Sequence, residues 1–225
     1  MAEQPFSGKR AALALLGAAL AVMSFIGVLG PMGLIFPLWI FTALFRRPLA
    51  RAFGVWPGST GFLAAAIIYG MAVEALAVWT NLARPPAERV LLDPSPGRDL
   101  LLGFFYYAFV AVCWYVLLRR IRFSEAGVFF VTGVYGIVME ESGRVVLRAI
   151  AHPLTGTLYA LLVMCVYGLF PMLALKVTQE RFPLRREPPS AGKYALALLA
   201  LFAQAALYGN TVYPLLKAWF AASGG

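Results

Sequence analysis

The stretch TGTLYALLVMCVYGLFPMLALK, residues 155–176, decides the fold class, because it holds no charged residue before its last position. In an α-helix rising about 1.5 Å per residue, about 20 apolar residues cross the roughly 30 Å hydrocarbon core of a membrane. Residues 155–176 therefore predict a transmembrane helix.

Six further apolar runs lie on either side of this stretch, separated by charged segments. The seven predicted spans lie near residues 11–29, 32–45, 61–80, 100–118, 125–150, 155–176 and 194–216. One helix over 11–45 would be about 52 Å long, so we expect two short helices joined at Gly30-Pro31-Met32-Gly33, with a re-entrant hairpin as the alternative. The sequence thus predicts a single integral membrane domain, 1–225, built as an all-α polytopic bundle of about seven transmembrane helices.

The composition of the chain agrees with this fold class. Of its 225 residues, 61% are hydrophobic and only 13% are charged, and the mean hydropathy is +0.79. Soluble domains are ordinarily about 45–50% apolar and about 25% charged. These values exclude a disordered chain, a disulfide scaffold and most soluble enzymes.

The net charge of +9 is explained by membrane orientation. With seven spans and an internal amino terminus, thirteen of the nineteen Lys and Arg residues fall in internal segments and six in external ones. Cytoplasmic loops carry such an excess, so we expect a multi-pass protein of the cell (inner or plasma) membrane with a cytoplasmic amino terminus and an external carboxyl terminus.

The basic residues form no continuous patch, which argues against nucleic acid as a binding partner. Membrane lipids are the expected partners, with a lipidic substrate or the subunits of a membrane complex as open alternatives.

Three spans carry a polar residue at about the same depth. Glu74, Glu140 and Asn210 lie about 21, 24 and 25 Å from the inner ends of their predicted helices. Small residues share their helical faces: Ala66, Gly70 and Ala77 with Glu74, Thr132 and Gly136 with Glu140, and Ala203 and Ala206 with Asn210. Ionisable residues within spans are costly and face the bundle interior, as faces of small residues do. We therefore expect the three polar side chains to line one cavity that opens to the external side.

The candidate site residues surround these three positions. The predicted catalytic residues are Glu74, Glu140 and Glu141, and the predicted substrate-binding residues are Arg144, Asn210, Asn81 and His152. Glu140 and Arg144 are four residues apart and can pair along a helix. Glu141 would then be free to act as a general acid or base, while Arg144 holds an anionic group.

The pair Glu140-Glu141 followed by Arg144 resembles the first motif of the CAAX-type intramembrane prenyl proteases. In that family the arginine follows after three residues and two later helices supply histidines. Here it follows after two residues, and His152 is the only histidine in the chain. The resemblance covers about five of 225 residues and does not assign the chain. It indicates only that a glutamate pair on a span can activate water when a metal or a histidine assists.

Few cofactors fit the sequence. A single histidine excludes bis-histidine haem and copper sites of several histidines, no lysine lies mid-span for a retinal Schiff base, and no nucleotide-binding motif is present. A divalent metal has no support from the histidine count. Three functions remain: a membrane enzyme for a lipidic or membrane-embedded substrate (an intramembrane hydrolase or lipid-modifying enzyme), a proton-coupled carrier using Glu74 and Glu140, and a structural subunit of a larger membrane complex.

Overall fold

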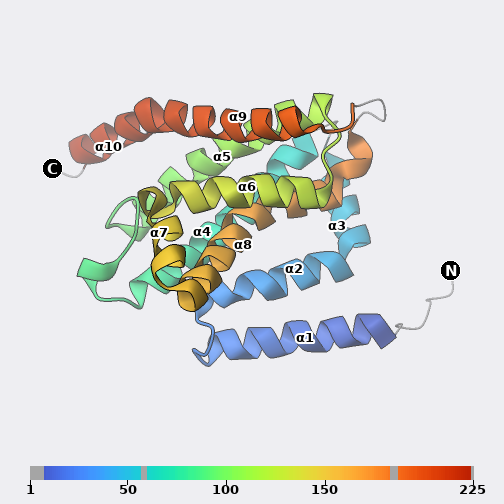
Figure 1. The fold of residues 1–225 in the computed structure, drawn as a ribbon, viewed down its shortest axis with the longest axis horizontal. Coiled ribbons are helices and arrows are strands. Elements are labelled where there is room, and N and C mark those ends of the chain that lie inside the picture. Colours follow the sequence, from blue (N-terminus) through green and yellow to red (C-terminus); the bar gives the residue numbers. More distant parts are fainter. Residues whose placement is uncertain (1–7, 57–59, 183–186, 224–225) are drawn as a thin grey trace.

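A computed structural model describes residues 8–56, 60–182 and 187–223, apart from the side chains of Glu141 and Ser142 (Figure 1). The elements are α1 (Gly8–Phe25), η1 (Pro31–Leu34), α2 (Ile35–Leu44), α3 (Arg46–Ala52), η2 (Phe53–Val55), α4 (Thr60–Leu82), η3 (Pro86–Glu88), α5 (Pro96–Arg120), α6 (Glu125–Met139), η4 (Glu140–Gly143), α7 (Arg144–Ala151), α8 (Pro153–Thr178), η5 (Gln179–Arg181), α9 (Ala191–Asn210) and α10 (Val212–Ser223).

The predicted all-α membrane bundle is confirmed, since the described residues form helices and no strand. Among them, five helical segments are long and apolar enough to cross a membrane: α1, α4, α5, α8 with η5, and α9 with α10. The pair Pro31–Leu44 and Arg46–Val55, bent by 84°, adds a sixth if it counts as one span. The predicted run 125–150 contains α6, whose 15 residues make a helix of only about 22 Å.

The run predicted as one helix over 125–150 is divided in two. α6 ends at Met139, η4 follows, and α7 starts a new direction at Arg144. Gly143 carries the change of direction, because its φ of 83° is in the left-handed region that favours glycine. Within α7, Val145 is buried while Arg144 and Arg148 are exposed, as in a helix lying across the end of a bundle.

The first two apolar runs form two helices joined by a turn, as expected from Gly30 and Pro31. Gly27 and Gly30 both have positive φ in this turn, and η1 and α2 then run back along α1 (Figure 1). Gly17 of α1 approaches Ile40 of α2 so closely that an added Cβ would lie 3.1 Å from it. α1 packs mainly on α2 and η1, at the edge of the molecule.

The centre of the bundle is formed by α4, α5, α6 and α8. Its largest fully buried side chains include Trp114, Tyr135, Phe62 and Phe170. The indole of Trp114 donates a 2.9 Å hydrogen bond to Thr132, which pairs two buried polar groups across α5 and α6.

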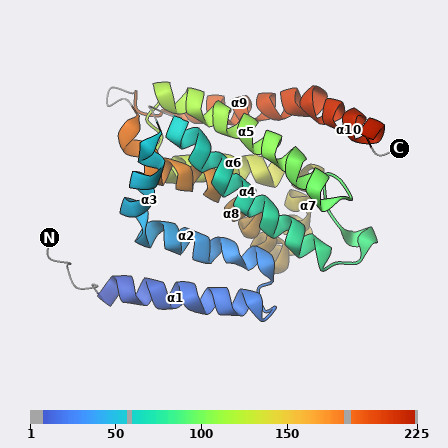
Figure 2. The ribbon, with the colours of Figure 1, turned by 180° about the vertical axis from the view of Figure 1, so that it is seen from behind.

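The two ends of the elongated molecule differ (Figure 2). One, here called the α3 end, gathers α3, the start of α6 and the last turn of α8, which are linked by Arg46 to the Lys176 carbonyl and by Lys176 to Glu125. The other, the α7 end, gathers α7, the start of α5 and α10, where Lys217 pairs with Asp93. The long axis between them is the axis along which the bundle would cross a membrane.

Candidate functional site

Polar side chains from five helices meet inside the bundle, toward the α7 end. We call them the carboxylate–tyrosine cluster: Glu74 of α4, Asp99, Tyr106 and Tyr107 of α5, Tyr135 of α6 with Glu140 at its end, Tyr167 of α8 and Gln204 of α9. The cluster contains two of the predicted catalytic residues, Glu74 and Glu140.

Glu74 is held by two residues of α5. The hydroxyl of Tyr107 donates a 3.0 Å hydrogen bond to its Oε2, and the carboxyl of Asp99, one turn before Gly103 on α5, is its acidic neighbour. Gly103 permits this approach, because a Cβ added there would lie 2.7 Å from Glu74 Cγ and 2.9 Å from Cδ. Gly70 of α4 likewise leaves room for the ring of Tyr107.

Asp99 is completely buried, with a relative exposure of 0%. Its Oδ1 accepts hydrogen bonds from the backbone N–H groups of Leu92 (2.5 Å) and Asp93 (3.0 Å). Its Oδ2 is also buried and accepts no hydrogen bond within the described part of the chain. A buried carboxylate oxygen without a partner is costly, and a proton held between this oxygen and the neighbouring carboxyl of Glu74 would lower that cost.

Glu140 forms the second acidic position of the cluster. Its Oε2 accepts a 2.7 Å hydrogen bond from the hydroxyl of Tyr167, and Gly136, one turn earlier, lies directly against the Tyr167 ring. The predicted ion pair of Glu140 with Arg144 is not formed between these described side chains. The reason is the left-handed turn at Gly143, which removes the helical relation on which an i,i+4 pair depends.

Tyrosines connect the two acidic positions. Tyr107, bonded to Glu74, and Tyr167, bonded to Glu140, are electrostatic neighbours. Beside them Tyr106 donates to Tyr135 at 3.1 Å, and the Gln204 amide donates to Tyr135 at 3.4 Å. The rings of these groups are in contact, Tyr106 with Tyr107 and Tyr135 with Tyr167, so hydroxyl groups that can both donate and accept a hydrogen bond lie between the two carboxyls.

The predicted substrate-binding residues lie outside this cluster. Asn210 is exposed and donates to the Ala206 carbonyl of its own helix at 2.7 Å, so the expected inward orientation of its side chain is wrong. Arg144 is exposed on α7, and His152 is exposed at the corner between α7 and α8. The side chain of Glu141 lies outside the described residues.

Asn81 is buried but engaged in holding the connection between α4 and α5. Its amide donates to the Ala77 carbonyl at 2.9 Å, and its Oδ1 accepts from Val90 N at 2.9 Å. Together with the bonds from Leu92 and Asp93 to Asp99, this contact ties the connection against the end of the bundle. The connection thus closes the α7 end above the cluster.

Sequence reasoning missed Asp99, Tyr135, Tyr167 and Gln204. The predicted span began at residue 100, which left Asp99 among the loop charges, whereas α5 begins at Pro96. Proline at the first helical position and an acidic residue in the first turn are a helix-start pattern that would have placed Asp99 inside the helix. Among the described residues, no three His, Cys, Asp or Glu side chains are grouped so that they could hold a metal ion.

Comparisons of the chain with protein-family models, with curated proteins and with solved structures gave no match.

Proposed function

We propose that the protein is a proton-coupled carrier of the membrane, in which the carboxylate–tyrosine cluster binds and releases the proton. The observation that carries the proposal is the meeting of Glu74 with Asp99, whose Oδ2 is buried without a hydrogen-bond partner. Two carboxylates are acceptors only, so they can share a hydrogen bond only when one of them has bound a proton.

The tyrosines give the proton a path beyond this pair. Tyr107 contacts Glu74, Tyr167 contacts Glu140, and Glu140 lies at the helix end nearest the break before α7. Carboxyls linked by hydroxyl groups inside a membrane bundle are typical of proton relays. The enzyme hypothesis needs Arg144 and Asn210 beside the carboxyls, but both are exposed, so the geometry favours the carrier.

The orientation follows from the charges. Among the described residues, eleven Lys and Arg lie in the segments of the α3 end and six in those of the α7 end. Cytoplasmic segments carry the excess, so in this proposal the α3 end faces the cytoplasm and the cluster lies in the outer half of the plasma membrane, which the chain crosses several times.

Infrared difference spectroscopy of the protein in proteoliposomes tests the proton site directly. Stepping the pH should reveal the C=O stretch of a protonated carboxyl in the native protein. Glu74→Gln and Asp99→Asn should each remove this band, while Glu88→Gln, an exposed carboxyl of η3, should leave it unchanged. A band that is absent, or equal in all four proteins, contradicts the proposal.

Transport of the proton is measured in the same vesicles with trapped pyranine and a potential set by K⁺ and valinomycin. The native protein and Glu88→Gln should acidify the interior at equal rates. Glu74→Gln should slow acidification about tenfold or more, the scale on which removing a group that accepts a transferred proton acts. Equal rates with and without Glu74 would overturn the carrier function and leave the cluster as a structural feature.

A further inference from the structure

A second polar site lies at the α3 end, far along the chain and the long axis from the carboxylate–tyrosine cluster. It is a pocket of about 840 Å³ between the start of α1, the bend from α2 to α3, and η5. We call it the arginine pocket, because its charged lining consists of Arg10, Arg46, Arg47, Arg51, Arg181 and Glu180.

Backbone carbonyls hold two of these arginines in place. Arg46 Nε donates to the Lys176 carbonyl at 3.0 Å, and Arg181 donates to the carbonyls of Gly54 (2.8 Å) and Trp56 (3.2 Å). These bonds fasten α3 and η2 to the end of α8 from both sides. The pocket is therefore built by tertiary contacts at the 84° bend after α2.

The charge of the pocket is unbalanced. Five arginines face one glutamate, Glu180, whose side chain is 85% exposed and 3.7 Å from Arg46. Arg10, Arg47 and Arg51 have no ion-pair partner within the described part of the chain. Guanidinium groups gathered in this way repel one another unless an anion lies between them. Their planar geometry suits bidentate hydrogen bonding to phosphate.

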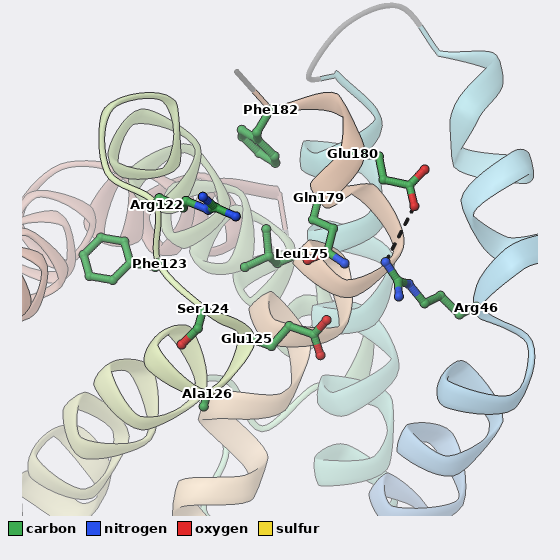
Figure 3. A pocket seen from close by; sticks show the side chains of 10 residues that line it. All are labelled: Arg46, Arg122, Phe123, Ser124, Glu125, Ala126, Leu175, Gln179, Glu180 and Phe182. Carbon is green, nitrogen blue, oxygen red and sulfur yellow. Dashed lines mark ion pairs between the residues drawn. The ribbon is translucent and has the colours of Figure 1, made fainter. Parts of the chain in front are cut away.

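An adjoining pocket shows that the imbalance is local. This second pocket, of about 640 Å³, shares Arg46 and Glu180 with the first and adds Arg122 and Glu125 (Figure 3). Its two arginines are matched by two glutamates, and Glu125 also binds Lys176 at 2.7 Å. The uncompensated positive charge of this end is thus concentrated on the α3 side of the Arg46–Glu180 pair.

The lining of the arginine pocket is also partly apolar. Leu44, at the end of α2, and Val55, which is 76% exposed, line it beside the charges. Trp56, half-exposed next to Val55, is of the residue type enriched where a membrane meets water. A ligand that matches both parts has an anionic head at the arginines and an apolar tail along the adjoining α2.

We propose that the arginine pocket binds the phosphate headgroup of an anionic phospholipid, with Arg47 and Arg51 as its principal contacts. The site is independent of the proton-binding proposal and shares no residue with that cluster. It would fix α3 at the membrane surface and explain why the chain bends there instead of continuing as one straight helix.

Native mass spectrometry with phosphatidylglycerol in mixed micelles tests this site. The native protein should retain this lipid with a Kd at least about tenfold below that for zwitterionic phosphatidylcholine, and Arg47→Gln/Arg51→Gln should raise the Kd by about the same factor. The matched control is Arg119→Gln/Arg120→Gln, which removes two exposed charges from the end of α5 at the same end of the molecule and should change the Kd little. Arg47→Lys/Arg51→Lys keeps the charge and should lose less affinity than the glutamine pair, which separates loss of binding from loss of folding.

Two results would overturn the assignment. Equal weakening by the Arg47/Arg51 and Arg119/Arg120 pairs would mean that the lipid senses only the general charge of this end. Inorganic phosphate that displaces the lipid at equal concentration would mean that the pocket recognises a free anion, not a lipid.

Discussion

At the scale of single residues, the carboxylate–tyrosine cluster depends on glycines that face its polar side chains. Gly103 lies against Glu74, Gly70 against Tyr107, and Gly136 against the ring of Tyr167. A Cβ at any of these positions would come within 3.0 Å of the neighbouring side chain. Each glycine therefore leaves free the space that a polar side chain of the neighbouring helix occupies.

Substitution of Gly103 tests this arrangement. Replacing an ordinary glycine inside a helix with alanine stabilises the protein by about 1 kcal/mol. Gly103→Ala differs, because its new Cβ forces the Glu74 carboxyl away from Asp99. We expect a net loss of about 1–3 kcal/mol, as in other overpacked cores, measured as a lower melting temperature in detergent. Gly97→Ala is the matched control, because it lies in the same helix with nothing within 4 Å of its Cβ, and it should not lower the melting temperature. The packing explanation fails if the two variants melt alike.

The residues of the cluster differ in how far the sequence could predict them. Glu74 stands alone in an apolar run, and this is visible from the sequence. Tyr135 and Tyr167 look like any other aromatic residue in a span, because their hydroxyl partners come from other helices. Pairing between helices depends on the rotation and depth of each helix, which the local sequence around a tyrosine does not encode.

At the scale of elements, the rule that small residues mark the inner face worked on two helices and failed on a third. Ala66 and Gly70 on α4, and Thr132 and Gly136 on α6, are buried as predicted. The corresponding face of α9, with Ala203, Ala206 and Asn210, is exposed. The inner face of α9 instead holds Ala197, Leu201, Gln204 and Tyr208.

The failure on α9 has a physical cause. α9 lies at the outside of the bundle, packing on α5 and α6, so its contact face needs side chains long enough to reach across. Tyr208 does so, donating to the Leu102 carbonyl at 2.9 Å. Small residues mark an interface only where two helix backbones come close, as Gly133 of α6 does against Met164 of α8.

The connection between α4 and α5 is held to α10 by an ion pair that gives stability a pH dependence. Lys217 Nζ lies 2.7 Å from Asp93 Oδ2. Burial alone would raise the pKa of Asp93, but the hydrogen bonds from Lys217 and Ser95 and the charges of Lys217 and Arg98 outweigh it and hold that pKa below its ordinary value.

The direction of the pH effect follows from this lowered pKa. Stability from Asp93 is fully present above the pKa of an unfolded aspartate, about 3.9, and is lost as the pH falls through the lower pKa of the folded state. Asp93→Asn should therefore melt below the native protein at pH 7, and the difference should shrink progressively as the pH falls below about 4. A difference that stays constant between pH 7 and pH 3 would assign the effect to packing rather than to the charge.

At the scale of the whole molecule, the two ends have distinct characters. The α3 end gathers most of the described basic residues, together with the arginine pocket and the 84° bend before α3. The α7 end is closed by the α4–α5 connection and by α7, which lie over the carboxylate–tyrosine cluster. The orientation of such a bundle is set by the distribution of its charges, which is visible in the sequence. For this reason the sequence predicted the architecture better than it predicted the site.

Membrane orientation is tested by labelling two positions at opposite ends of the α9–α10 segment. Ser190, at the start of α9, and Ser223, at the end of α10, are both exposed and are separated by a helix long enough to cross the membrane. With Cys113 and Cys165 replaced by serine, Ser223→Cys in spheroplasts should react with an impermeant maleimide, whereas Ser190→Cys should react only after the membrane is permeabilised. The reverse pattern would invert the orientation and move the carboxylate–tyrosine cluster to the cytoplasmic half of the bilayer. Labelling of both positions from one side would mean that α9 and α10 do not cross, because a continuous apolar helix whose two ends share one aqueous compartment must lie on the membrane instead of spanning it.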